Sequence, residues 1–200
     1  MPINVFEEMR KGAAYDIRQE DYVEQVHSEL NRCASLCQEI NATDVNDSIV
    51  DLPKGNTEIV AEFIQKAVGA DLFEVETEKS YAIDYTQCTI EAKEELRNND
   101  RPELVKMLDS VAEYDNIVVA GPCWWGTYPV AVFTQLEALD FSGKKVFPVM
   151  THEGSGIAGA PAALKKYCHG AVVGEGLAIQ GGAATGSEAK VAAWAKKNLA

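Results

Sequence analysis

The stretch of sequence that decides the fold spans residues 117–129 and reads Ile117-Val118-Val119-Ala120-Gly121-Pro122-Cys123-Trp124-Trp125-Gly126-Thr127-Tyr128-Pro129. Its first four residues are apolar and predict a buried strand. The remainder predicts a loop, because two adjacent tryptophans stand between glycines and prolines. An indole has a wide apolar face and one N–H donor, and open α/β sheets bind ligands at the carboxyl ends of their strands. The tryptophan pair therefore indicates either a platform for a flat ligand or a cover over the local core.

Strands and helices alternate along most of the chain. Strands are predicted at 49–52, 71–76, 117–120, 145–150 and 171–179, and helices at 56–68, 86–98, 130–139, 160–167 and 187–198. Alternation with short links produces βαβ units and a parallel sheet with helices on both faces. We therefore predict an α/β fold whose doubly wound parallel sheet has five strands in the order 2-1-3-4-5.

The first 45 residues differ from the rest. Between Glu20 and Ile40, apolar residues recur at spacings of three and four, which predicts an amphipathic helix. A shorter helix is predicted over 5–11 and ends at Gly12. We therefore predict a helical extension over 1–45, followed by one α/β domain over 46–200.

Composition limits the classes of partner. The 200 residues are 46% hydrophobic and 24% charged, with a net charge of −13. A strongly acidic chain disfavours nucleic acid and anionic membranes, which attract basic patches. It suits a partner protein with a basic docking face, although plain solubility would also account for the charge. A homodimer is left open.

The cysteines and the lengths of the apolar runs indicate the cellular compartment of the protein. The five cysteines follow no disulfide framework, and Cys33 and Cys37 have no His or Cys at metal-ligand spacing. No run reaches the roughly 20 apolar residues of a membrane span, and the first ten residues lack the apolar core of a signal peptide. Reduced thiols in a cytoplasmic protein fit best.

Three polar or glycine-rich loops follow predicted strands and should meet at one edge of the sheet. The first is 52–57, where a helix N-terminus with Gly55, Asn56 and Thr57 favours phosphate, although Asn and Thr are also ordinary capping residues. The second is the tryptophan loop, and the third is 151–156. Together they predict a cleft that binds a phosphate at one end and a flat ring at the other. His152 and Glu153 have no catalytic partners at a recognisable spacing.

Motifs in these loops, in this order, resemble flavodoxin, in particular the bacterial flavodoxin-like subgroup with a Trp-Trp loop at the flavin ring. The resemblance covers about residues 48–200 and rests on 55–57, 70–74, Pro122 with 124–127, 140–144 and 151–156. It implies a flavodoxin-like fold with FMN as the cofactor. It places the phosphate on Gly55, Asn56 and Thr57, with Lys54 adding charge. It places the isoalloxazine ring between two loops that comprise Pro122, Cys123, Trp124, Trp125 and Gly126, and Thr151, His152, Glu153, Gly154, Ser155 and Gly156.

The resemblance implies electron transfer by a flavin, which passes one or two electrons under control of stacking, hydrogen bonds and nearby charge. Two alternatives stay open. One is an enzyme of the same fold, an NAD(P)H-dependent FMN or quinone reductase, although no second nucleotide motif is evident. The other is a non-redox binding module. Cys123 is either a thiol that tunes the flavin or a small packing residue.

Two parts of the chain depart from the flavodoxin pattern. Leu52 and Lys54 occupy positions where the family usually has hydroxyl donors to phosphate, and the segment before them, 44–51, is unusually polar for a central strand. Residues 8–16 and 37–43 resemble the N-terminal helical domain of maltose and galactoside O-acetyltransferases. That resemblance does not imply acetyl transfer, because the hexapeptide repeats of those enzymes are absent. The segment is expected to act as a helical cap.

Overall fold

A computed structural model of the chain describes residues 55–82 and 84–199. These fall into two units, one comprising 55–81 and 90–199 and the other comprising 82 and 84–89. The larger unit holds the whole of the described sheet. The predicted helical extension, its boundary at residue 45 and the predicted first strand lie outside the described residues.

The helices formed where the apolar periodicity predicted them. They are α3 (Asn56–Val68), α4 (Tyr85–Asn98), α5 (Val130–Glu137), α6 (Ala160–Tyr167) and α7 (Glu188–Leu199). α3 ends at Gly69, whose φ of 70° is the left-handed conformation that glycine adopts without strain. None of the described helices is long and apolar enough to cross a membrane.

The described sheet is parallel throughout and is centred on β2 (Lys145–His152). β1 (Asn116–Pro122) pairs along one edge of β2, from Asn116↔Lys145 to Pro122↔Thr151. Two short strands, β3 (Val172–Val173) and β4 (Leu177–Gln180), pair with the other edge. The adjacency of the predicted third, fourth and fifth strands is thus confirmed.

Two strand predictions need correction. The predicted last strand, 171–179, is interrupted between β3 and β4, where the Phe147 ring occupies the space that a side chain on Gly174 would need. The predicted strand at 71–76 does not form. Its neighbourhood makes one isolated antiparallel bridge, Thr77↔Leu104. Leu72, in the middle of this segment, is 47% exposed.

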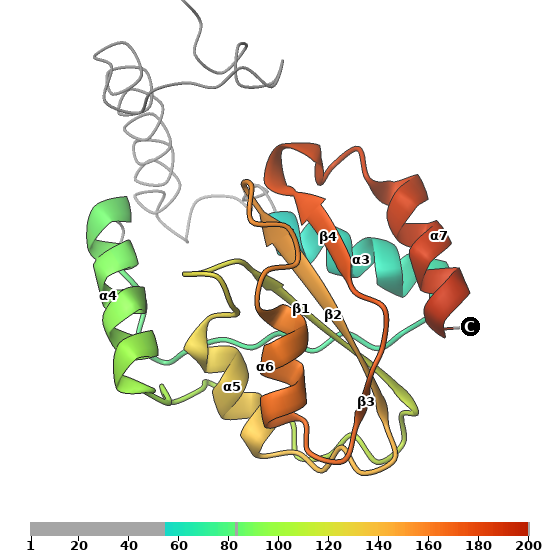
Figure 1. Cartoon of the computed structure of the whole chain (residues 1–200), viewed down its shortest axis with the longest axis horizontal. Coiled ribbons are helices and arrows are strands. Elements are labelled where there is room, and N and C mark those ends of the chain that lie inside the picture. Colours follow the sequence, from blue (N-terminus) through green and yellow to red (C-terminus); the bar gives the residue numbers. More distant parts are fainter. Residues whose placement is uncertain (1–54, 83, 200) are drawn as a thin grey trace, which may run out of the picture. The chain divides into compact units, whose positions relative to one another are not determined.

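Helices cover both faces of the sheet (Figure 1). Side chains of β2 alternate between two cores, as the pleat of a strand requires. Val146 and Met150 pack with α5 and α6, whereas Phe147 and Val149 pack with α3 and α7. Burial of each such side chain contributes about 1.5–3 kcal/mol relative to exposure. The two cores hold the strands in register and so fix the positions of the loops at their carboxyl ends.

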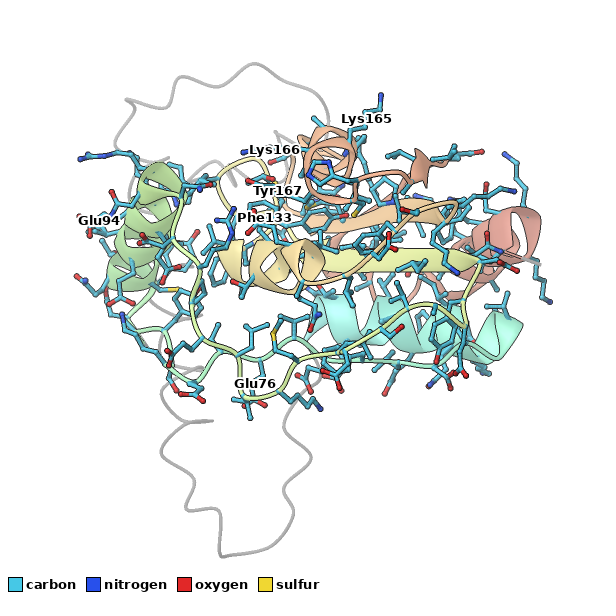
Figure 2. All side chains as sticks on the ribbon, turned by 90° about the horizontal axis from the view of Figure 1, so that it is seen from below. Glu76, Glu94, Phe133, Lys165, Lys166 and Tyr167 are labelled. Atoms are coloured by element: carbon cyan, nitrogen blue, oxygen red, sulfur yellow. The ribbon has the colours of Figure 1, made fainter. Side chains whose placement is uncertain are left out.

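An aromatic stack joins α5 to α6. Phe133 and Tyr167 lie side by side (Figure 2), with ring centroids 4.3 Å apart and an interplanar angle of 24°. The Arg101 guanidinium lies 5.7 Å and 5.3 Å from these two ring centroids. Arg101 also donates two hydrogen bonds to Glu137, at 2.8 and 2.7 Å, and these bonds lower the pKa of the Glu137 carboxyl. This stack therefore links α5 to α6 on one face of the sheet.

Candidate functional site

The tryptophan loop is a tight turn at the end of β1. Trp124 N–H donates to the Thr127 carbonyl at 2.8 Å, and Thr127 N–H donates back to the Trp124 carbonyl at 3.1 Å. The central residues, Trp125 and Gly126, both have positive φ, 51° and 81°. Positive φ at both central positions is typical of type I′ turns, but it is uncommon for a residue as bulky as tryptophan. Backbone strain of this kind is concentrated at functional sites.

The two indoles have different surroundings. Trp125 is 51% exposed, and the Lys93 Nζ lies 4.6 Å from the centroid of its ring. Trp124 is half-buried and meets Tyr81 edge-on, with centroids 4.9 Å apart at 84°. Tyr81 in turn donates a 2.8 Å hydrogen bond to Glu95 of α4. The Trp125 ring is therefore accessible to a ligand, whereas the Trp124 ring packs against Tyr81.

Tyr128 anchors the loop to the sheet. Its side chain is 1% exposed, and its hydroxyl donates to the Val119 carbonyl of β1 at 2.8 Å. Burial raises the pKa of the phenol, so that it stays protonated and donates. The ring lies directly against Gly121, where an added Cβ would be 2.6 Å from Cδ1 of Tyr128. Glycine at 121 is therefore needed for this anchor.

Residues at the end of β2 and in the loop after it hold the tryptophan loop at two points. Cys123 N–H donates to the Thr151 carbonyl at 2.8 Å, and Gly159 N–H donates to the Gly126 carbonyl at 2.9 Å. A Cβ on Gly159 would lie 2.8 Å from that carbonyl oxygen, so the close approach also depends on glycine. The second and third predicted loops are therefore in direct contact.

The first loop joins the same cluster through its threonine. The hydroxyls of Thr57 and Thr151 are 2.7 Å apart and hydrogen-bonded, and Thr151 is only 5% exposed. Thr151 thus contacts the tryptophan loop with its carbonyl and the start of α3 with its side chain. A Cβ built on Gly181, just beyond β4, would overlap the Glu153 carboxylate and the Asn56 amide nitrogen. Glu153 therefore reaches toward the start of α3.

The remaining predicted residues line these loops. Gly55 caps α3 with extended backbone and open space around it. Pro122 is paired opposite Thr151, and Cys123 packs against the core. Gly154 and Ser155 are exposed, and Gly156 has a φ of 62°. His152 accepts the Gly154 N–H at Nδ1, 3.0 Å away, which fixes the turn of the third loop. Lys54 lies outside the described residues.

Several residues that shape the site were not predicted from the sequence, namely Tyr81, Lys93, Tyr128, Gly159 and Gly181. Tyr128 lies within residues 117–129, next to the tryptophan pair. The other four act through contacts between distant segments, and a single sequence contains no signal for them. Within the described residues, no group of three His, Cys, Asp or Glu side chains could hold a metal ion.

A separate surface hollow of about 620 Å³ contains none of the predicted site residues. It is lined by Glu78, Lys79, Glu95, Asp100, Arg101, Pro102 and Glu103. One of its lining residues, Glu95, receives the Tyr81 hydrogen bond. The loops joined at Thr151 are therefore the better candidate for the functional site.

Thr151→Val tests the link between the loops. Valine keeps the shape of threonine but removes the hydroxyl, which leaves the Thr57 hydroxyl without this partner. We expect the free energy of unfolding to fall by about 1 kcal/mol, as measured by urea denaturation. Thr134→Val is the matched control, and it should cost less because it removes a longer bond, 3.2 Å to the Pro102 carbonyl. Equal stability of the parent and Thr151→Val would contradict the link.

Comparisons with known proteins identify the family and similar folds. The family model described as flavodoxin matches residues 52–198. A proposed flavoprotein of Bacteroides uniformis is 31% identical, with a TM-score of 0.62 over 72% of this chain and 93% of its own. One of Bacteroides eggerthii is 25% identical, with a TM-score of 0.62 over 74% and 94%.

A third structure is a Lactobacillus acidophilus flavoprotein in complex with FMN. It is 22% identical, with a TM-score of 0.51 over 66% of this chain and 90% of its own, and it supports the fold alone. No curated protein matches the chain. The family model spans the sheet, the helices on its two faces and all three loops that meet at Thr151, and on that match the chain belongs to the flavodoxin family.

Proposed function

We propose that this chain binds FMN across the three loops and acts as an electron-transfer protein that carries one or two electrons between redox partners. The proposal rests above all on the position of Thr151. This residue joins the start of α3, which suits a phosphate, to the loop that presents the exposed Trp125 ring. Membership of the flavodoxin family supports FMN as the ligand.

The residues present fit a flavin mononucleotide. At one end, Gly55 leaves open space at the N-terminus of α3, where first-turn backbone N–H groups and the helix dipole favour an anion. At the other end, the half-exposed Trp125 ring offers a stacking surface. Bound FMN would supply the one- or two-electron chemistry.

The protein's own residues would orient the ligand and set its electrical surroundings. The Thr57–Thr151 pair and the two backbone bonds to the tryptophan loop fix the separation between the phosphate end and the ring end. The edge-on contact between Trp124 and Tyr81 stabilises the tryptophan loop. Lys93 places a positive charge over Trp125, and α4 carries three carboxylates against two basic residues, Lys93 and Arg97. A negative surface opposes the gain of electrons by a bound ring, and the lysine acts in the opposite direction.

The acidic surface suits a partner with a basic docking face. Glu91, Glu94 and Glu95 lie on α4 beside Lys93, and Figure 2 shows Glu94 on the outer side of that helix. A basic protein that docks there would come close to the exposed Trp125. Electrostatic steering of this kind accelerates association and is weakened by salt.

Electron delivery to a basic acceptor tests the proposal. The FMN-loaded full-length chain, reduced with dithionite, should reduce cytochrome c at a rate that falls as the salt concentration rises. It should not consume NADH or NADPH steadily in the presence of a quinone. Steady NAD(P)H consumption would show instead that the chain is a reductase, and a chain that binds no flavin would support a non-redox binding module.

A further inference from the structure

Gly181 occupies an unusual place at the carboxyl end of the sheet. It directly follows β4, whose last residue, Gln180, pairs with His152 of β2. It begins the short 3-10 turn Gly181–Ala183, and it is buried. The backbone at Gly181, which follows β4, therefore lies beside the loops that follow β1 and β2.

This glycine leaves space that two polar side chains fill. A Cβ on Gly181 would overlap the carboxylate of Glu153 and would lie 2.6 Å from Nδ2 of Asn56. Asn56 is the first residue of α3, and Glu153 belongs to the loop after β2. The absent side chain at 181 thus allows groups from two different loops to meet at the start of α3.

Both overlapping atoms are the ends of flexible side chains, not backbone. Alanine at 181 would therefore be accommodated by rotation of Asn56 and Glu153 away from the helix start, with little change to the core. Gly181 also has an ordinary φ, because it is not among the glycines with positive values. Glycine is needed at 181 because any larger residue would displace the side chains of Asn56 and Glu153.

We propose that Gly181 is a positioning residue for the phosphate end of the FMN site. It keeps the Asn56 amide at the N-terminus of α3, where the amide adds a hydrogen-bond donor to the backbone N–H groups. The Glu153 carboxylate ends in the same space. Because a carboxylate repels phosphate, any loss of FMN affinity in Gly181→Ala must come from the Asn56 amide, and the double-mutant cycle with Asn56→Ala tests this. The inference rests on the proposed function, since it assigns a role within the same site.

The experiment compares two neighbouring glycines in the full-length chain. Gly181→Ala should weaken FMN binding about tenfold, the effect of losing one hydrogen bond to a charged group. It should leave riboflavin binding unchanged, because riboflavin has no phosphate. Gly182→Ala is the matched control, since a Cβ on Gly182 meets nothing within 4 Å. Affinities are measured by quenching of flavin fluorescence, and thermal unfolding of the flavin-free variants checks the fold.

A double-mutant cycle with Asn56→Ala tests whether Gly181→Ala weakens FMN binding through the Asn56 amide. In the Asn56→Ala background, Gly181→Ala should cause little further loss of FMN affinity. Equal loss of FMN and riboflavin, unchanged FMN binding in Gly181→Ala, or full additivity with Asn56→Ala would each overturn the assignment. If the parent chain binds no FMN, the proposed function fails and the assignment fails with it. If the parent binds FMN and Gly181→Ala binds it equally well, only the assignment fails.

Discussion

Gly121→Ala is expected to lower the free energy of unfolding by about 2–4 kcal/mol. The added Cβ would lie 2.6 Å from Cδ1 and 3.1 Å from Cε1 of Tyr128. Tyr128 cannot yield easily, because its ring is 1% exposed and its hydroxyl donates to the Val119 carbonyl. Overpacking of a core costs about 1–3 kcal/mol, and loss of a buried hydrogen bond adds about 1 kcal/mol. Urea denaturation of the flavin-free protein measures the change.

Gly154→Ala is the control for this substitution, since a Cβ there meets nothing within 4 Å and its φ is not positive. It should stay within about 0.5 kcal/mol of the parent, as most surface substitutions do. The same small change in Gly121→Ala would mean that Tyr128 does not anchor the loop in the way that its contacts indicate.

Replacement of either tryptophan by alanine is expected to weaken flavin binding. Stacking of a flat heteroaromatic ring on an aromatic side chain contributes about 1–3 kcal/mol, so Trp125→Ala should reduce the affinity roughly 5- to 150-fold. FMN and riboflavin should be affected alike, because the indole faces the ring and not the phosphate. The flavin-free variant should unfold like the parent, since Trp125 is 51% exposed.

Trp124→Ala should differ in one respect. Trp124 is braced by Tyr81, so its loss should weaken flavin binding and also lower the stability of the flavin-free protein. Tyr114→Ala, an exposed aromatic just before β1 at the opposite end of the sheet, serves as the control for both variants. Flavin affinities equal to the parent's in both tryptophan variants would rule out the tryptophan loop as the ring site.

The fold was predictable to the extent that local periodicity governs it. The helix at 56–68 and the helix at 160–167 follow from apolar spacing alone, and the structure has both with the same ends. The break between β3 and β4 was not predictable, because it depends on the Phe147 ring packing onto Gly174 from a neighbouring strand. The segment 71–76 has the alternation of a strand, yet among the described residues it forms none, and only Thr77 beside it makes an isolated bridge, to Leu104.

The site was predictable as a set of loops but not as a set of contacts. Parallel strands place their carboxyl ends together, so the convergence of the three loops followed from topology. The contacts depend on side chains that are far apart in sequence. Examples are the hydrogen bond between Thr57 and Thr151, the packing of Tyr81 on Trp124, and the space at Gly181 that Asn56 and Glu153 fill. The predicted role of Lys54 stays a prediction, because that residue lies outside the described part of the chain.

The decisive measurement is a titration of the flavin-free, full-length protein with FMN and, in parallel, with riboflavin. We predict saturable binding of one FMN per chain, with flavin fluorescence quenched on contact with the tryptophan loop. Riboflavin should bind more weakly, because the N-terminus of α3 then has no phosphate to hold. Unquenched fluorescence at every FMN concentration, with no saturation, would contradict FMN binding at these loops.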